Sequence, residues 1–144
     1  MTSPVDAARG WVGTPFEHAG RVKGLQGGTD CVGLVLGVAK EVGLVDEDFQ
    51  TPFYEEFNDG SLLTAIFPDY AQPVELSDAV PGDVVVMQYG RYPQHIGIVA
   101  DCPVGLFGLS IIDAYSPLRR VAERPLDESL IGRIVQVWRV AWVK

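Results

Sequence analysis

The chain has 144 residues, a formal net charge of −8 and a pI near 4.6. Its 47% hydrophobic and 21% charged residues are typical of a globular protein, and we expect a single domain spanning residues 1–144. The acidic balance excludes a basic stripe for a nucleic-acid backbone and a polybasic run for an anionic membrane, so neither is an expected partner.

The N-terminal segment lacks the basic start and apolar core of a signal peptide, and no apolar run reaches membrane-spanning length. We therefore expect cytoplasmic synthesis and no membrane insertion. The two cysteines, Cys31 and Cys102, are too few for a disulfide framework and lie in unlike contexts. Both are interpreted as reduced thiols.

The first half of the chain predicts helices. Ser3 and Pro4 are typical of a helix start, and Thr14-Pro15-Phe16 forces an extended segment. In chain order, the expected elements are a helix over residues 4–11 or 4–12, a glycine-containing loop, a helix over about 30–42, an acidic and aromatic surface excursion over 44–60, and a short helix over 61–67.

The second half predicts strands. V-P-G-D-V-V-V-M-Q-Y (80–89) is a turn followed by a β-branched strand. Further strands are expected over 95–100, 109–115 and 133–143, with a turn at 105–108. Because helices come first and a meander of strands second, the sequence predicts an α+β fold in which N-terminal helices pack on a C-terminal antiparallel sheet.

Cys31 falls in the first turn of the second predicted helix, which Thr29 or Asp30 can cap. The positive end of a helix dipole and unpaired backbone N–H groups favour a thiolate at such a position. Most single cysteines are small buried hydrophobes. The position therefore indicates a nucleophile only if a base lies nearby.

His95 opens a predicted strand, where its imidazole can take the proton of Cys31 if the two meet. Asp113 lies inside an apolar strand, where an unpaired carboxylate is costly. Strand alternation and antiparallel pairing would place Asp113 beside His95, as the group that orients the imidazole. A histidine hydrogen-bonded at a strand edge and an aspartate facing a turn are the alternatives.

His18 precedes the cysteine helix and either lines a pocket or is solvated. A zinc site built from His18, Cys31, His95 and Cys102 has no recognisable ligand spacing. No phosphate-binding glycine motif or nucleotide fingerprint occurs. We expect no metal and no cofactor.

Five stretches in order resemble the NlpC-type cysteine peptidases, which are papain-like endopeptidases that cut peptidoglycan stem peptides. These stretches are G-T-P-F, D-C-V-G-L, L-S-D-A-V-P-G-D-V-V-V, H-I-G-I-V and I-I-D-A-Y, and they cover nearly the whole chain. The lead-in P-F-E-H-A-G-R-V-K-G (15–24) is most similar to the subgroup carried by tails of phages and phage-like gene transfer particles.

The resemblance implies that Cys31 is the nucleophile, His95 the general base and acid, and Asp113 the orienting residue. It further implies substrate contacts from the residues at and around the nucleophile motif, namely Phe16, His18, Asp30 and Val32. Three positions depart from the family pattern: Asp113 replaces the commoner histidine, Phe16 a tyrosine, and Val32 a serine. The C-P-V-G-L-F-G turn between His95 and Asp113 is longer than in many relatives.

The implied function is hydrolysis of peptide bonds in peptidoglycan by a cysteine peptidase. The partners of such a protein would be peptidoglycan and other tail or baseplate proteins. The protein would be part of a virion tail and would act on the cell wall in the periplasm. Two alternatives remain open: a structural tail protein with little activity, and an amidase at the sugar–peptide junction or an acyltransferase.

Overall fold

The structure is a computed structural model that describes residues 2–56 and 58–142. Its elements, in chain order, are α1 (Pro4–Arg9), β1 (Arg21–Val22), β2 (Gly28–Thr29), α2 (Cys31–Glu41), α3 (Ser61–Tyr70), β3 (Ala71–Val74), β4 (Val84–Met87), β5 (His95–Asp101), β6 (Leu109–Tyr115), β7 (Arg120–Pro125), α4 (Glu128–Arg133) and β8 (Ile134–Val140). Within the described ranges, no helix is long and apolar enough to cross a membrane.

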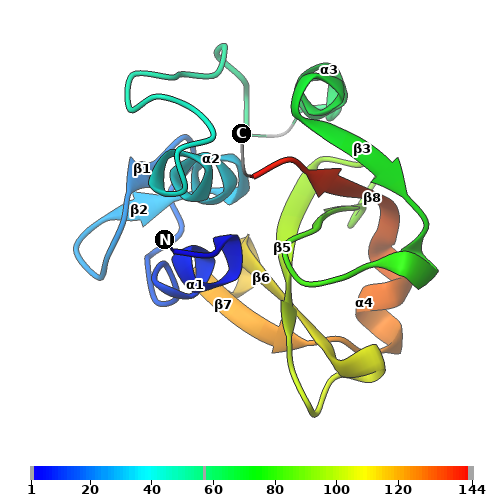
Figure 1. Ribbon diagram of the computed structural model, residues 1–144. Helices are drawn as coiled ribbons and strands as arrows, with labels where there is room; N and C mark the ends of the chain where they lie inside the picture. The colour runs from blue at the N-terminus through cyan, green and yellow to red at the C-terminus, as the bar shows by residue number, and fades with distance from the viewer. Residues whose placement is uncertain (1, 57, 143–144) are drawn as a thin grey trace.

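A six-stranded antiparallel sheet forms the body of the molecule, in the order β3-β8-β4-β5-β6-β7 (Figure 1). Strands β4, β5 and β6 are the first three strands of the predicted meander, whereas β7, which continues it in the sheet, was not predicted. The last strand, β8, does not extend the meander but returns between β3 and β4. It ends at Val140, three residues before the predicted boundary, and the predicted final residue 143 lies outside the described residues.

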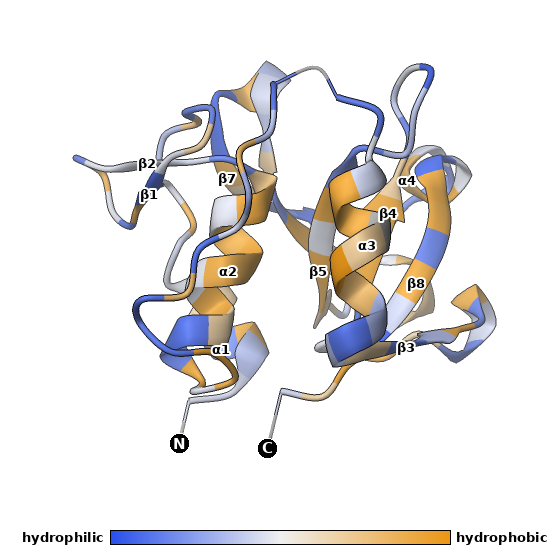
Figure 2. Ribbon diagram, turned by 90° about the horizontal axis from the view of Figure 1, so that it is seen from above, coloured by the Kyte–Doolittle hydropathy of each residue, from blue (hydrophilic) through white to orange (hydrophobic). Residues whose placement is uncertain are grey.

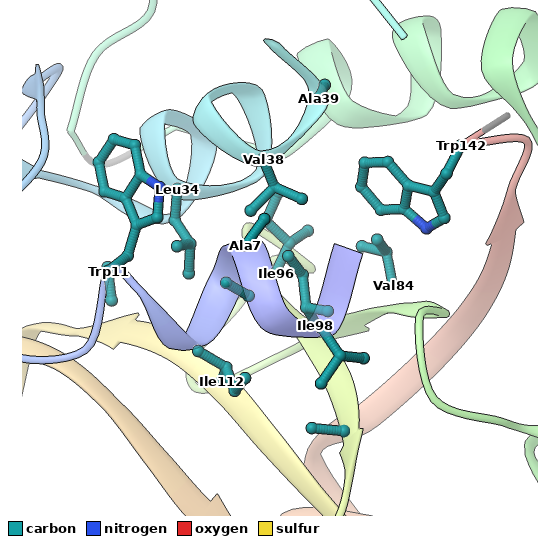
Figure 3. Close-up of a cluster of buried hydrophobic side chains, with 14 of the residues drawn as sticks. Ala7, Trp11, Leu34, Val38, Ala39, Val84, Ile96, Ile98, Ile112 and Trp142 are labelled. Atoms are coloured by element: carbon teal, nitrogen blue, oxygen red, sulfur yellow. The ribbon is translucent and has the colours of Figure 1, made fainter. Parts of the chain in front are cut away.

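Helices α1, α2 and α3 lie on one face of the sheet, and Figure 2 shows α2 and α3 in front of β5. Leu34 and Val38 of α2 pack on this face (Figure 3). The opposite face is covered in part by α4 through Leu130. Alternation along β5 turns Ile96 and Ile98 toward the helices and Val99 toward the other face.

Two of the predicted helix starts are confirmed in detail. The Ser3 side chain caps α1 by accepting from the backbone N–H of Asp6. Asp30, one of the two proposed capping residues, caps α2 by accepting from the backbone N–H of Gly33 at 2.8 Å. Helix α1 ends at Arg9, earlier than predicted, and tight turns carry the chain from there to Thr14.

Candidate active site

Cys31 is the first residue of α2, where the Asp30 cap fixes the start of the helix beside the sheet. The apolar face of α2 is buried against β5 and β6, so packing of the helix sets the position of its N-terminus. The thiol is partly exposed, and its Sγ lies 4.0 Å from the carbonyl oxygen of Gln94, the residue before β5. The nucleophile candidate therefore faces the start of the histidine strand.

His95 and Asp113 lie together, as strand alternation predicted. Nε2 of His95 lies 2.8 Å from Oδ2 of Asp113, and the Asp113 side chain has no solvent exposure. Gly97 makes this possible, because a Cβ there would lie 2.6 Å from a methyl group of Ile111 and 3.2 Å from Cβ of Asp113. Since Nε2 is engaged by the carboxylate, Nδ1 is the ring nitrogen left for the thiol.

Arg124 on β7 completes this cluster, and sequence reasoning did not find it. Nη2 of Arg124 lies 2.5 Å from Oδ2 of Asp113, and Nε lies 3.3 Å from Oδ1. The same guanidinium donates to the hydroxyl of Tyr89 and lies 4.0 Å from the ring centroid of Tyr115. The buried carboxylate thus lies between an arginine and a histidine, and hydrogen bonds from both groups hold its orientation.

The electrostatics of the cluster favour a protonated His95. Burial lowers the pKa of His95, but hydrogen bonds with Asp113 and Cys31, together with the charges of both groups, outweigh burial and raise the pKa to about 9. At neutral pH the imidazole therefore carries a positive charge. An imidazolium beside Cys31 can hold a thiolate and can later donate a proton to a leaving group.

A cleft of about 230 Å³ opens in front of Cys31 and His95. Asp113 does not line it but lies behind His95. The four residues predicted to contact substrate all line this cleft: Phe16, His18, Asp30 and Val32. Tyr89 and Tyr115 line it beside His95, and most of its surface is apolar.

Asp30 is fully engaged by protein groups, although it lines the cleft. Besides capping α2, its carboxylate accepts from the backbone N–H of Ala19 at 2.8 Å, from Arg21 at 3.2 Å and from the hydroxyl of Tyr54 at 2.5 Å. Burial is the largest cause raising the pKa of Tyr54, and its bond to Asp30 adds to the shift. The phenol therefore stays neutral and donates.

Tyr54 changes the interpretation of residues 44–60. The sequence predicted a surface excursion, and Phe53 is indeed exposed. Tyr54, however, turns inward to Asp30, Arg21 and the ring of His18, so this segment builds one wall of the cleft. Phe57, in the same segment, lies outside the described residues.

In residues 2–56 and 58–142, no group of three or more histidine, cysteine or acidic side chains is placed to hold a metal ion. Cys31 and Cys102 are both free thiols. Cys102 lies after β5 and is not among the residues that line the cleft.

Comparison with protein-family models gave no match, and neither did comparison with curated proteins. Solved structures do match the fold, among them the following two. A Staphylococcus aureus protein described as similar to a lipoprotein of the NLP/P60 family matches with a TM-score of 0.62 and 18% identity, over 95% of this chain and 40% of its own. The present chain thus spans less than half the length of that protein.

The second structure is RipD of Mycobacterium tuberculosis, described as a non-catalytic NlpC/p60 domain protein adapted to peptidoglycan binding. It matches with a TM-score of 0.58 and 15% identity, over 98% of this chain and 99% of its own. At these identities the likeness shows the fold, which is the α+β, papain-like fold of NlpC/P60 domains.

Proposed function

We propose that the protein is a cysteine endopeptidase that hydrolyses peptide bonds in peptidoglycan stem peptides or crosslinks. The observation that carries the proposal is the arrangement of a thiol at a helix N-terminus, an imidazole and a buried carboxylate, with His95 2.8 Å from Asp113. The substrate class is supported by the NlpC/P60 fold and by the five sequence stretches that resemble such peptidases.

The proposed reaction has two halves. The Cys31 thiolate attacks the scissile carbonyl, and the backbone N–H of Cys31 helps to hold the oxyanion. His95 gives its proton to the leaving amine as the C–N bond breaks, which leaves a thioester. Neutral His95 then takes a proton from water as water attacks the thioester, the C–S bond breaks, and the acid leaves. Asp113 orients the imidazole throughout, and Arg124 holds Asp113 in place.

The direct test is digestion of defined muropeptides, with the products weighed by mass spectrometry. We expect two fragments, one carrying a new amine and the other a new carboxyl group, whose summed mass exceeds that of the substrate by one water. Cleavage within the stem or crosslink supports an endopeptidase. Release of an intact stem peptide from the sugar would instead assign an amidase. Unchanged muropeptides would contradict both activities.

A second candidate function is peptidoglycan binding without cleavage. The RipD structure, described as non-catalytic and adapted to peptidoglycan binding, favours it. Phe16 and Val32 fit the same view, because each places an apolar side chain in the cleft where the resembled family commonly has a hydroxyl. The state of the Cys31 thiol separates the two candidates without knowledge of the scissile bond.

We expect Cys31 to be alkylated much faster than Cys102 at mildly acidic pH, because the imidazolium of His95 stabilises a thiolate beside it. Above about pH 9 this advantage should shrink, since His95 then loses its proton. The measurement is the rate of reaction with iodoacetamide against pH. The Cys102→Ala variant reports Cys31, and the Cys31→Ala variant reports Cys102. Matching profiles that both rise near about pH 8.5, as for ordinary thiols, would favour the binding role.

We also place the protein, as part of this proposal, in the tail of a phage or phage-like particle that opens the wall locally. The support is the lead-in at residues 15–24, which is similar to that subgroup. On this view the partners are peptidoglycan and neighbouring tail or baseplate proteins, and the site of action is the wall reached from outside the cell.

A further inference from the structure

One wall of the cleft carries a buried polar atom whose hydrogen-bonding capacity is unused. Among the residues that the structure describes, the buried side-chain atoms without a hydrogen-bond partner are Trp11 Nε1 and Gln94 Oε1. Trp11 packs against Gly37 in the core. Gln94 instead lines the cleft, and its backbone carbonyl oxygen lies 4.0 Å from Sγ of Cys31. A buried side-chain acceptor without a partner, on a residue next to the nucleophile, needs an explanation, and a bound ligand would supply one.

The main chain around Gln94 is held firmly, so its side chain is carried at a defined position. Gly60 packs on the preceding peptide so closely that a Cβ there would lie 2.3 Å from the carbonyl oxygen of Pro93. Upstream, the amide of Gln88 donates to the carbonyl oxygens of Gly90 and Arg91 at 3.0 and 3.2 Å. His95, which follows directly, is paired with Met87 in the sheet.

Three other polar groups of the cleft are committed to protein partners, namely Asp30, His95 and the hydroxyl of Tyr89. Asp30 accepts from two backbone N–H groups and two side chains, one of which is Tyr54. His95 binds Asp113, and the hydroxyl of Tyr89 accepts from an arginine. A substrate could pair with these groups only by displacing an existing bond. Oε1 of Gln94 needs no such displacement.

We propose that the side-chain amide of Gln94 binds the main chain of the peptide substrate beside the bond that Cys31 attacks, with Oε1 accepting a peptide N–H. A glutamine amide presents an acceptor and a donor, and a peptide group presents the complement of each. Binding also removes the cost of the unmatched buried acceptor, which adds to the gain from the new bond. The inference rests on the proposed function and names the residue that positions its substrate.

The test is the Gln94→Met variant, which keeps the side-chain length and removes the amide. We expect KM for a defined muropeptide to rise about tenfold, which is the effect of one lost hydrogen bond, while kcat changes less than about threefold. The melting temperature should stay equal or rise, because no protein hydrogen bond is lost. Gln88→Met is the matched control: it removes two bonds within the same connection, so its melting temperature should fall while KM stays unchanged.

Three results would overturn the assignment of Gln94. An unchanged KM would show that the amide does not touch substrate. A lower melting temperature with unchanged KM would show a structural role. A fall in kcat with unchanged KM would place the amide on the reacting carbonyl in the transition state instead.

Binding to the Cys31→Ala variant separates this inference from the proposed function. Calorimetry with the same muropeptide should give a dissociation constant about tenfold higher when Gln94→Met is added. Equal constants would reject the role of Gln94 and leave the proposed function standing. No binding by Cys31→Ala would reject both.

Discussion

Replacing Cys31 with alanine is expected to reduce muropeptide cleavage by about 10⁴-fold or more, to the level left by binding and backbone contacts alone. The thioester cannot form without the sulfur, and His95 then has no nucleophile to serve. The fold should survive, because the side chain is partly exposed and the start of α2 is held by Asp30. We expect the free energy of unfolding to stay within about 1 kcal/mol of the wild type.

Cys102→Ala is the matched control for this variant. Cys102 is the other free thiol of the described chain and does not line the cleft, so its loss should leave cleavage unchanged. Cleavage rates and thermal melts of the three proteins check the prediction. Full activity in Cys31→Ala would contradict the cysteine mechanism. Equal losses of the cleavage rate in both variants would indicate a general requirement for thiols.

Replacing Arg124 with methionine is expected to lower the free energy of unfolding by about 3–5 kcal/mol, the usual result of breaking a buried ion pair from one side. Asp113 has no exposure and would keep only His95 as a partner. Cleavage should fall as well, because Arg124 holds the carboxylate that orients the imidazole. Denaturant unfolding at neutral pH, together with kcat/KM, measures both effects.

Arg120→Met is the control on the same strand: its side chain is exposed, and we expect a change within about 0.5 kcal/mol. Combining Arg124→Met with Asp113→Asn should recover part of the lost stability, because no unpaired charge is then buried. If Arg124→Met is as stable as Arg120→Met, the buried pair does not stabilise the fold.

The Cys31, His95 and Asp113 cluster could be predicted because each residue lies in an element with a strong local pattern. An Asp cap opens a long apolar helix, and the β5 and β6 strands are strongly apolar runs joined by a turn. Alternation within such strands fixes which side chains share a face. The sheet was therefore predicted in outline, together with the three helices of the first half of the chain. Helix α4, between β7 and β8, was not predicted.

Arg124 could not be predicted in the same way. Its strand, R-V-A-E-R-P, mixes charged and apolar residues and ends in proline, so it carries little strand signal. The strand exists because it pairs with β6, and that register places Ala122 opposite Asp113 and Arg124 two residues further on the same face. Predicting β7 would have revealed the pair.

Tyr54 and the edge strand β3 were missed for a related reason. Residues 44–60 show only weak periodicity, and Tyr54 contacts Asp30 through a tertiary hydrogen bond between residues 24 positions apart in the sequence. Strand β3 contains Pro73, which a strand tolerates at a sheet edge, and β3 is the edge strand beside β8. The position of Tyr54 and the formation of β3 both depend on residues far away in the chain, so local composition does not predict them.

The absence of a side chain at Gly97 leaves room for side chains of the neighbouring strand β6. The space above Gly97 is occupied by Ile111 and by Cβ of Asp113, which would lie only 3.2 Å from an added methyl group. The nearest obstacle to a side chain at position 97 is the methyl group of Ile111, at 2.6 Å, and the contact at 113 is with a Cβ that every residue except glycine has. An engineer who enlarges position 97 must therefore make room at Ile111 first, whatever orienting residue stands at 113.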